Sequence, residues 1–518
     1  MLMRTLLTLF SLSFRWLTWA ESEDAIHSLP GLSFDPNFKH YSGYLKTART
    51  HFLHYWFVTS QNNPNSDPLV FWFNGGPGCS SLDGLLNEMG PYQVNPDGQT
   101  LRQNRNSWNK NASIVYIESP VGVGFSYSSD GFSGFPSDDS TSTENYEAFK
   151  QFFLKFPAFR LNRVFIAGES YGGIYVPTLV GRILERLKKF PVNLEGMAIG
   201  NGCVNQALDT DTLVRFAYGH GLVGEKEWTD IEKECCNGCF DDCDLSAQRG
   251  ECRKKVEEIV TFCWEGGLNV YDLFRPCDTK SERNSIKMRA IKRGILRAKS
   301  SPNKSHRWHF GFNEVTLNCC FVNTPVKSGA GRNGVSMNSD GRRFYSDVPC
   351  LDDTSIINYL NIPSGIICLC SPYNLVIQSG RLYTLHQPKL CRIGTFAMIG
   401  LTWSTACNTV GYLASFWRCS IAADVSSLVR KAVDSKLRVL LYYGDTDMAC
   451  NFLQGQQFSA QLGLEKPWHF DGQIGGFKTQ YAKGLTFITV RGAGHMVPQW
   501  RGPQMDYAFG QFLANRTI

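Results

Sequence analysis

Charged residues are scarce in this sequence, and the net charge is small for the length of the chain. They make up 19% of the 518 residues, and the formal net charge is +6. The excess of lysine and arginine is concentrated between residues 280 and 307 instead of forming a stripe along the chain. We therefore expect no nucleic acid as the main partner.

Long apolar runs are also missing. Beyond residue 20, no stretch is long enough to be a transmembrane helix, so we expect no membrane span. The chain has no internal repeat and no long low-complexity tract. Its hydrophobic fraction of 43% is too high for a disordered protein and predicts a folded, soluble body, large enough for one domain that carries a substantial insertion.

The N-terminus has the pattern of a secretory signal peptide. Residues 1–20 contain Arg4, then an apolar run, and end at Ala20, although a buried N-terminal helix is the alternative. All 18 cysteines lie beyond this segment, as expected for an oxidising compartment. Three Asn-x-Ser/Thr triplets also favour the secretory route and are candidate glycosylation sites: Asn111, Asn303 and Asn515.

Short apolar runs that end in glycine-rich or polar turns recur in both halves of the chain and predict the strands of one sheet. Helical stretches lie between several of them, so we predict an α/β architecture with a mostly parallel sheet. Residues 41–58 alternate like an antiparallel hairpin at the sheet edge. The predicted strands are Leu69–Phe73, Ser113–Ile117, Val164–Ala167, Met197–Ile199, Val439–Tyr443 and Leu485–Val490, and the predicted helices are Glu144–Phe156 and Gly173–Lys188.

The strand pattern stops between residues 203 and 350, where cysteines crowd together. We interpret 203–350 as an inserted lid, which leaves a discontinuous core of residues 21–202 and 351–518. Thiolates with the spacing found in the lid can bind zinc, but disulfides are favoured in an oxidising compartment, and the spacing alone does not give the pairing. The clustered cysteines are Cys235, Cys236, Cys239, Cys243 and Cys252.

A predicted strand leads directly into the motif G-x-S-x-G around Ser170. Gly168 and Gly172 permit a sharp strand-to-helix turn that lifts the serine hydroxyl above the sheet. An ordinary glycine-rich turn is the alternative. A serine needs a base to take its proton and an acid to orient that base, so an acid and a histidine are expected further along the chain.

Two later strands supply these groups. The strand 439–443 ends before Asp445 and Asp447, and the strand 485–490 ends before His495. The order serine, acid, histidine is that of α/β-hydrolases. Spacing does not choose between the two aspartates, one of which would only cap the turn.

A glycine-rich loop follows the strand 69–73 and runs from Asn74 to Ser81. Backbone amides in such a loop approach a ligand closely and can donate to the oxyanion of a tetrahedral intermediate. The amides of Gly76 and Tyr171 are the candidates. A phosphate-binding loop is the rival interpretation, but this loop matches neither G-x-x-x-x-G-K-[ST] nor G-x-G-x-x-G.

Four motifs in this order resemble the serine carboxypeptidases: N-G-G-P-G-C-S-S at 74–81, G-E-S-Y-G at 168–172, G-D-T-D-M-A-C-N at 444–451 and G-A-G-H-M-V-P at 492–498. The similarity covers roughly residues 27–280 and 405–518. The segments 278–320 and 362–401 depart from the family pattern. The resemblance implies an α/β-hydrolase fold with a cysteine-rich lid and an acyl-enzyme mechanism that needs no metal or organic cofactor.

The resemblance also implies roles for particular residues. Asp447 would complete the triad with Ser170 and His495, and the terminal carboxylate of a peptide would bind to Asn74, Gly75, Glu88 and Glu169. A carboxyl group can hold a carboxylate only when it carries a proton, so we expect raised pKa values and activity at acidic pH. The implied disulfides are bridges within the lid cluster, Cys277 with Cys350, and Cys79 with Cys407.

The function that follows is the release of C-terminal amino acids from peptides with a free C-terminus, in the lysosome or outside the cell. Some relatives transfer acyl groups to acceptors other than water, and such an acyltransferase would have the same triad. A non-catalytic role as a protective partner of lysosomal glycosidases is a third possibility. Family members often form homodimers.

Overall fold

The computed structural model describes residues 24–130, 136–240, 243–277, 350, 353–360, 362, 374–378, 381–385, 424–459, 466–481 and 484–518. Several predictions lie outside these residues: the signal peptide 1–20, the sequon at Asn303, the cysteine Cys407 and nearly all of the divergent segments 278–320 and 362–401.

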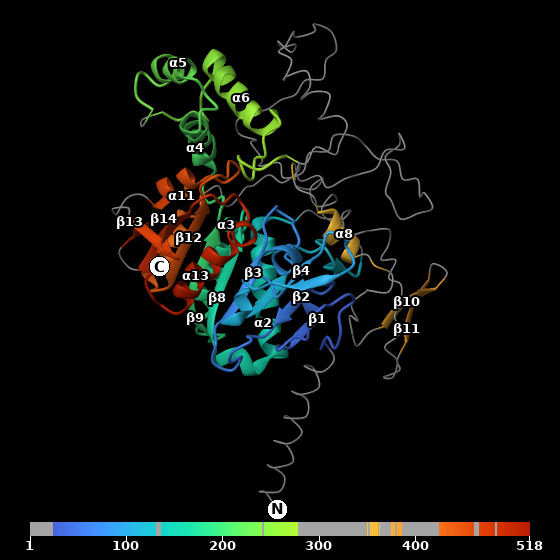
Figure 1. Cartoon of the computed structure of the whole chain (residues 1–518). Helices are drawn as coiled ribbons and strands as arrows, with labels where there is room; N and C mark the ends of the chain where they lie inside the picture. Colours follow the sequence, from blue (N-terminus) through green and yellow to red (C-terminus); the bar gives the residue numbers. More distant parts are fainter. Residues whose placement is uncertain are drawn as a thin grey trace, which may run out of the picture.

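The central feature is a sheet in which a parallel middle is flanked by antiparallel strands (Figure 1). Its strand order is β1-β2-β6-β3-β8-β9-β12-β15-β14-β13, and β7 pairs with β2. Neighbours from β6 to β15 run parallel, which confirms the mostly parallel sheet. The hairpin expected at 41–58 is β1 (His40–Lys46) and β2 (His51–Val58), antiparallel and at one edge.

The predicted strands all form, three of them with the predicted ends. They are β3 (Leu69–Phe73), β6 (Ser113–Ile117), β8 (Arg163–Glu169), β9 (Asn193–Gly200), β12 (Arg438–Gly444) and β15 (Leu485–Val490). The other strands are β4 (Tyr92–Val94), β5 (Leu101–Gln103), β7 (Tyr127–Ser128), β10 (Asn374–Gln378), β11 (Arg381–Leu385), β13 (Lys466–Phe470) and β14 (Gln473–Gln480).

Helices cover both faces of the sheet, because successive strand residues point to opposite sides and both sides are apolar. One core packs Phe71, Ile166 and Leu441 against α2 (Asp138–Lys155), α3 (Gly172–Arg186) and α10 (Ser426–Asp434). The other packs Trp72 and Phe165 against η1 (Gly84–Glu88), η2 (Trp108–Lys110), α8 (Thr354–Leu360) and α13 (Gly502–Leu513). The remaining helices of the sheet region are η3 (Pro157–Leu161), α11 (Phe452–Ser459) and α12 (Val497–Trp500).

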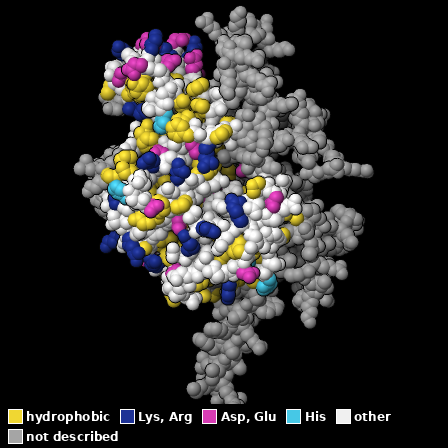
Figure 2. Space-filling model, viewed as in Figure 1, with side chains coloured by type: hydrophobic (Ala, Val, Ile, Leu, Met, Phe, Trp, Pro, Cys, Tyr) yellow, Lys and Arg dark blue, Asp and Glu magenta, His cyan; other side chains and the backbone are white. Residues whose placement is uncertain are grey.

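A separate group of helices stands off one end of the sheet: α4 (Gln206–Gly219), α5 (Glu225–Cys235) and α6 (Gly250–Glu265) (Figure 1). They have a small apolar core of their own, around Val214, Ile231 and Val256. Lysine, arginine, aspartate and glutamate side chains mix on their surface (Figure 2), with ion pairs such as Lys226–Asp230 and Arg253–Glu257. No strand occurs between residues 203 and 277 in the described part of the chain.

The cysteines of this region form disulfides. Cys235 is bonded to Cys252, Cys236 to Cys243, and Cys277 to Cys350. The resemblance implies bridges within the cluster and the pair Cys277–Cys350, but it does not give the partners within the cluster. Cys239 is an exposed free thiol; bridges made within a cluster of five cysteines leave at least one of them outside a pair. Within the described ranges, no group of three or more His, Cys, Asp or Glu side chains could hold a metal ion.

Candidate active site

The proposed nucleophile Ser170 occupies a strained turn between β8 and α3. Its φ is +59°, in the left-handed region that a residue with a side chain seldom adopts. The turn is tight enough to need glycine before it, because a Cβ atom on Gly168 would lie 2.5 Å from the carbonyl oxygen of Phe73. The amide of Ser170 donates to the carbonyl oxygen of Gly200 (3.0 Å). This geometry is that of a nucleophile elbow.

The histidine and one of the two aspartates meet at the same edge of the sheet. Because β8, β12 and β15 run parallel, the residues after their carboxyl ends gather there. His495 Nδ1 lies 2.7 Å from Asp447 Oδ2, and both side chains are buried. Asp445 accepts a hydrogen bond from the amide of Gly492 (2.6 Å).

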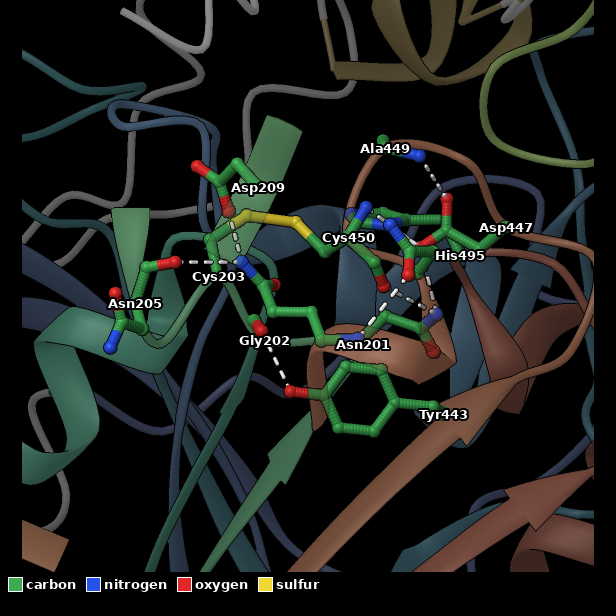
Figure 3. Close-up of a disulfide and its surroundings, with 12 residues drawn as sticks. Asn201, Gly202, Cys203, Asn205, Asp209, Tyr443, Asp447, Ala449, Cys450 and His495 are labelled. Carbon is green, nitrogen blue, oxygen red and sulfur yellow. Dashed lines mark hydrogen bonds and ion pairs between the residues drawn. A yellow bond between two sulfur atoms is a disulfide. The ribbon is translucent and has the colours of Figure 1, made fainter. Parts of the chain in front are cut away.

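Asp447 is fixed by further donors. Its Oδ2 accepts from Asn201 Nδ2 (2.8 Å) and from the amide of Cys450 (3.2 Å), and its Oδ1 accepts from the amide of Ala449 (2.9 Å) (Figure 3). His495 is held from the other side, since its amide donates to the carbonyl oxygen of Tyr271 (2.7 Å). Preorganised contacts of this kind keep a base in one orientation.

The glycine-rich loop lies directly against the nucleophile. A Cβ atom on Gly75 would be 2.4 Å from the amide nitrogen of Tyr171 and 2.7 Å from Cβ of Ser170, so only glycine fits there. Ser81 anchors the loop by donating to the carbonyl oxygen of Ile117 (2.6 Å) and accepting from the amide of Asn74 (3.1 Å). The amide of Tyr171, at the start of α3, therefore lies beside both the loop and the serine, where a helix N-terminus favours negative charge. Gly76, the other candidate, is the next residue of the loop after Gly75.

Two buried glutamates lie beside the nucleophile. Glu169 is the last residue of β8 and Glu88 the last of η1, and each accepts a 3.0 Å hydrogen bond from Asn74 Nδ2 through Oε1. The Asn74 amide is oriented in turn by Trp72, whose Nε1 donates to Asn74 Oδ1 (2.6 Å). Within the described residues, Oε2 of each glutamate has no N–H or O–H donor.

These surroundings raise the pKa of both carboxyl groups. Burial raises the pKa of Glu88 to about 7, although the hydrogen bond from Asn74 opposes the shift. Burial raises the pKa of Glu169 well above its usual value, and the charges of Glu88 and Asp83 add to the effect. Two neighbouring buried carboxyl groups with raised pKa values retain at least one proton at acidic pH.

Two features of the site were not expected from the sequence: the side chain of Asn201, which reaches Asp447, and the disulfide between Cys203 and Cys450 (Figure 3). A signal was present, since Asn201 follows a predicted strand at its carboxyl end and Cys450 lies inside the motif at 444–451. The spacing of the cysteines along the chain does not predict that Cys203 and Cys450 form a disulfide.

The remaining predicted positions are two sequons and a cysteine of the glycine-rich loop. Asn111 and Asn515 are exposed, as a glycosylation site requires, and Cys79 is half-buried in the glycine-rich loop. Its expected partner Cys407 is outside the described residues. Across the described ranges, every helix is too short or too polar to cross a membrane.

Comparisons with known proteins agree with this geometry. The family model described as serine carboxypeptidase matches residues 30–364 and 400–515. The match includes 278–320 and leaves out 365–399, most of the second segment that departs from the family motifs. Within the family, the motifs resemble those of cathepsin A, the lysosomal protective protein.

Full-length relatives support the same assignment. The mouse lysosomal protective protein is 36% identical, over 96% of this chain and 96% of its own length. A serine carboxypeptidase of Caenorhabditis elegans is 33% identical, over 99% of this chain and 97% of its own length. Among solved structures, a prohormone-processing carboxypeptidase from Saccharomyces cerevisiae superposes with a TM-score of 0.63 at 20% identity, covering 95% of this chain and 96% of that one, which supports the α/β-hydrolase fold.

Proposed function

Because the chain belongs to the serine carboxypeptidase family, and so is a serine-type carboxypeptidase, we propose that Ser170, His495 and Asp447 are its catalytic triad and that the Asn74–Glu88–Glu169 cluster recognises the free C-terminus of a peptide. The observation that carries this proposal is the position of the carboxyl pair, one residue from the nucleophile at Glu169. A site that holds a terminal carboxylate there places the last peptide bond at Ser170.

Carboxylate recognition depends on protons. A protonated glutamate donates one hydrogen bond through its O–H group, whereas an ionised glutamate only accepts. The pKa of about 7 for Glu88 therefore leaves a donor for the substrate carboxylate at acidic pH and removes it in mildly alkaline solution. Asn74 and the backbone at Gly75 complete the binding site on the side of the glycine-rich loop.

The reaction follows from these positions. The hydroxyl of Ser170 attacks the carbonyl carbon of the last peptide bond while its proton passes to Nε2 of His495, and the amides of Gly76 and Tyr171 stabilise the oxyanion. The intermediate collapses, and His495 gives the proton to the nitrogen of the departing amino acid. Water then loses a proton to His495 and attacks the acyl-enzyme, which releases the shortened peptide and restores Ser170.

Leucine release from a blocked Phe-Leu dipeptide at pH 5 tests this function. We expect release by the wild type, loss of release in Ser170→Ala, and no loss in Ser427→Ala, an exposed serine on α10. The amidated dipeptide should be a poor substrate. Release that survives Ser170→Ala would contradict the proposal, and transfer of the acyl group to an added alcohol in place of water would favour the acyltransferase alternative.

Finer aspects of the biology are also part of the proposal. We expect residues 203–350 to act as a lid over the site, and the segment after α6 supports this because Tyr271 lies 5.1 Å from His495 between ring centres. The name of the mouse relative and the disulfides support a lysosomal or secreted location. Association with lysosomal glycosidases and homodimer formation are expected by the same resemblance, and gel filtration of the secreted protein alone and with a glycosidase measures both.

A further inference from the structure

A short segment, Asn201 to Cys203, lies between the nucleophile and the acid of the site. It follows β9, the strand between β8 and β12 in the sheet. The disulfide Cys203–Cys450 ties its end to the loop after Asp447 (Figure 3). We call Asn201–Cys203, together with its disulfide to Cys450, the bracket.

One end of the bracket holds Asp447. Asn201 Nδ2 donates to Asp447 Oδ2 (2.8 Å), the same oxygen that lies 2.7 Å from His495 Nδ1. The Asn201 side chain is itself fixed, because its Oδ1 accepts from the amide of Gly444 (2.9 Å). The amide of Cys450 adds a second contact to Oδ2 (3.2 Å). Asp447 is therefore oriented by Asn201 and by the amide of Cys450, the disulfide partner of Cys203.

The other end of the bracket holds the nucleophile turn. The amide of Cys203 donates to the carbonyl oxygen of Ser170 (3.1 Å). The backbone of Cys203 also packs against α3, since a Cβ atom on Gly173 would lie 2.8 Å from its carbonyl oxygen. The hydroxyl of Tyr443 also contacts the middle residue of the bracket, because it donates to the carbonyl oxygen of Gly202 (2.7 Å). The strained turn at Ser170 thus rests on the same segment as the acid.

We propose that the bracket sets the position of Asp447, and through it His495, relative to Ser170, so that Asn201, Cys203 and Cys450 are positioning residues for the reaction. This inference rests on the catalytic triad proposed above. Reacting groups must be held to within a fraction of an ångström, and a misplacement of about 1 Å can lower the rate by about 100-fold. The disulfide joins the loop that carries Asp447 to the segment that contacts the Ser170 turn, and so limits such misplacement.

A purely stabilising disulfide is the competing explanation. The Cys203–Cys450 bond closes a long loop, with a sequence separation of 247, and cross-links of this kind restrict the unfolded chain. If the disulfide only stabilises the fold, its removal lowers the melting temperature and leaves the kcat of the folded enzyme unchanged. If it also positions the acid, its removal lowers kcat at temperatures where the variant is fully folded. The two explanations therefore differ in kcat.

The test compares Cys203→Ser/Cys450→Ser with Cys235→Ser/Cys252→Ser, which removes a disulfide within the helical group at 206–265. Both are assayed on the full chain with blocked Phe-Leu at pH 5, well below their melting temperatures. We expect the first variant to lose about 10-fold in kcat with KM within about 2-fold of wild type. It should also react about 10-fold more slowly with a fluorophosphonate that labels Ser170. The second variant should keep the wild-type kcat.

Asn201→Gly provides an independent test if the first variant does not fold. Asn201 has a φ of +35°, which glycine adopts without strain, so this substitution removes the contact to Asp447 and leaves the backbone free to keep its shape. We expect a loss of about 10-fold in kcat with little change in KM. An unchanged kcat in folded Asn201→Gly, or in the folded double-serine variant, would overturn the bracket. A wild type that neither releases leucine nor reacts with the fluorophosphonate would instead refute the proposed function.

Discussion

Two buried carboxyl sites lie near Ser170, and they differ in the donors around them. Asp447 has four partners: His495, Asn201 and the amides of Ala449 and Cys450. Glu88 and Glu169 share one side-chain amide, that of Asn74. Burial is similar at the two sites, since all three carboxyl groups are at most 3% exposed.

The difference in donors separates two tasks that both need an acid. A carboxylate with all its oxygens satisfied is held still and can orient a histidine. A pair of carboxyl groups with few donors retains a proton, as the raised pKa of Glu88 and of Glu169 indicates, and can bind an anion. We therefore attribute the two proposed roles to the number of N–H donors more than to burial.

The largest effect is expected from Asp447→Asn. An amide at this position would present N–H to Nδ1 of His495 and favour the wrong tautomer, which in a comparable triad lowers kcat by about 10⁴-fold. We expect a loss of about 10³- to 10⁴-fold in kcat for blocked Phe-Leu at pH 5, with KM little changed. A loss below about 10-fold would remove the contrast between the two acids.

Glu88→Gln/Glu169→Gln tests the proton of the carboxyl pair. Wild-type kcat/KM should fall about 5-fold between pH 7 and pH 8, because Glu88, with a pKa of about 7, loses its proton there and then repels the substrate carboxylate. Glutamine cannot ionise and keeps its N–H donors at every pH. The variant should change by less than about 2-fold over the same interval. A variant profile that still falls about 5-fold would assign the pH dependence to other groups.

The same pair should make the protein more stable in acid. The pKa of Glu88 rises from 4.5 in the unfolded reference to about 7 in the fold, so the native state binds more protons than the unfolded state between these values. Its contribution to stability is complete below pH 4.5 and is lost as the pH rises through 7. We expect the melting temperature to fall over this range in the wild type and to fall less in Glu88→Gln/Glu169→Gln. Equal slopes would show that the pair does not titrate in the fold.

The smallest effect is expected from Asp445→Asn, the matched control for Asp447→Asn. The side-chain oxygen of asparagine can still accept from the amide of Gly492, the contact that Asp445 makes in the structure. We expect kcat to stay within about 2-fold of wild type. A loss comparable to that of Asp447→Asn would mean that the choice between the two aspartates is wrong.

Much of the sheet could be predicted from the sequence because its strands are continuous apolar runs between turns. Leu69–Phe73 and Leu485–Val490 match β3 and β15 at both ends. The start of α2 was missed, since it begins at Asp138 in a polar stretch that Ser137 caps, whereas periodicity indicated Glu144. The strand β14 was not predicted, because its sequence contains two glycines and no clean alternation.

Some residues of the candidate site could be predicted from local sequence pattern, and others could not. Ser170 and His495 follow strands, so local pattern was sufficient to find them. Glu88 lies in η1 with no local signal, and only the resemblance to the family pointed to it. Pairing of Cys203 with Cys450 depends on β9 and β12 being neighbours in the sheet, a long-range fact that spacing along the chain does not contain.

The central claim is that a protonated carboxyl pair beside Ser170 recognises the free C-terminus. The most direct test measures wild-type kcat/KM for blocked Phe-Leu and for its amide at pH 5 and at pH 8. We expect the preference for the free acid to be large at pH 5 and to shrink about 10-fold or more at pH 8, as Glu88 loses its proton. A preference for the free acid that is the same at both pH values, or a preference for the amide at pH 5, would contradict the account.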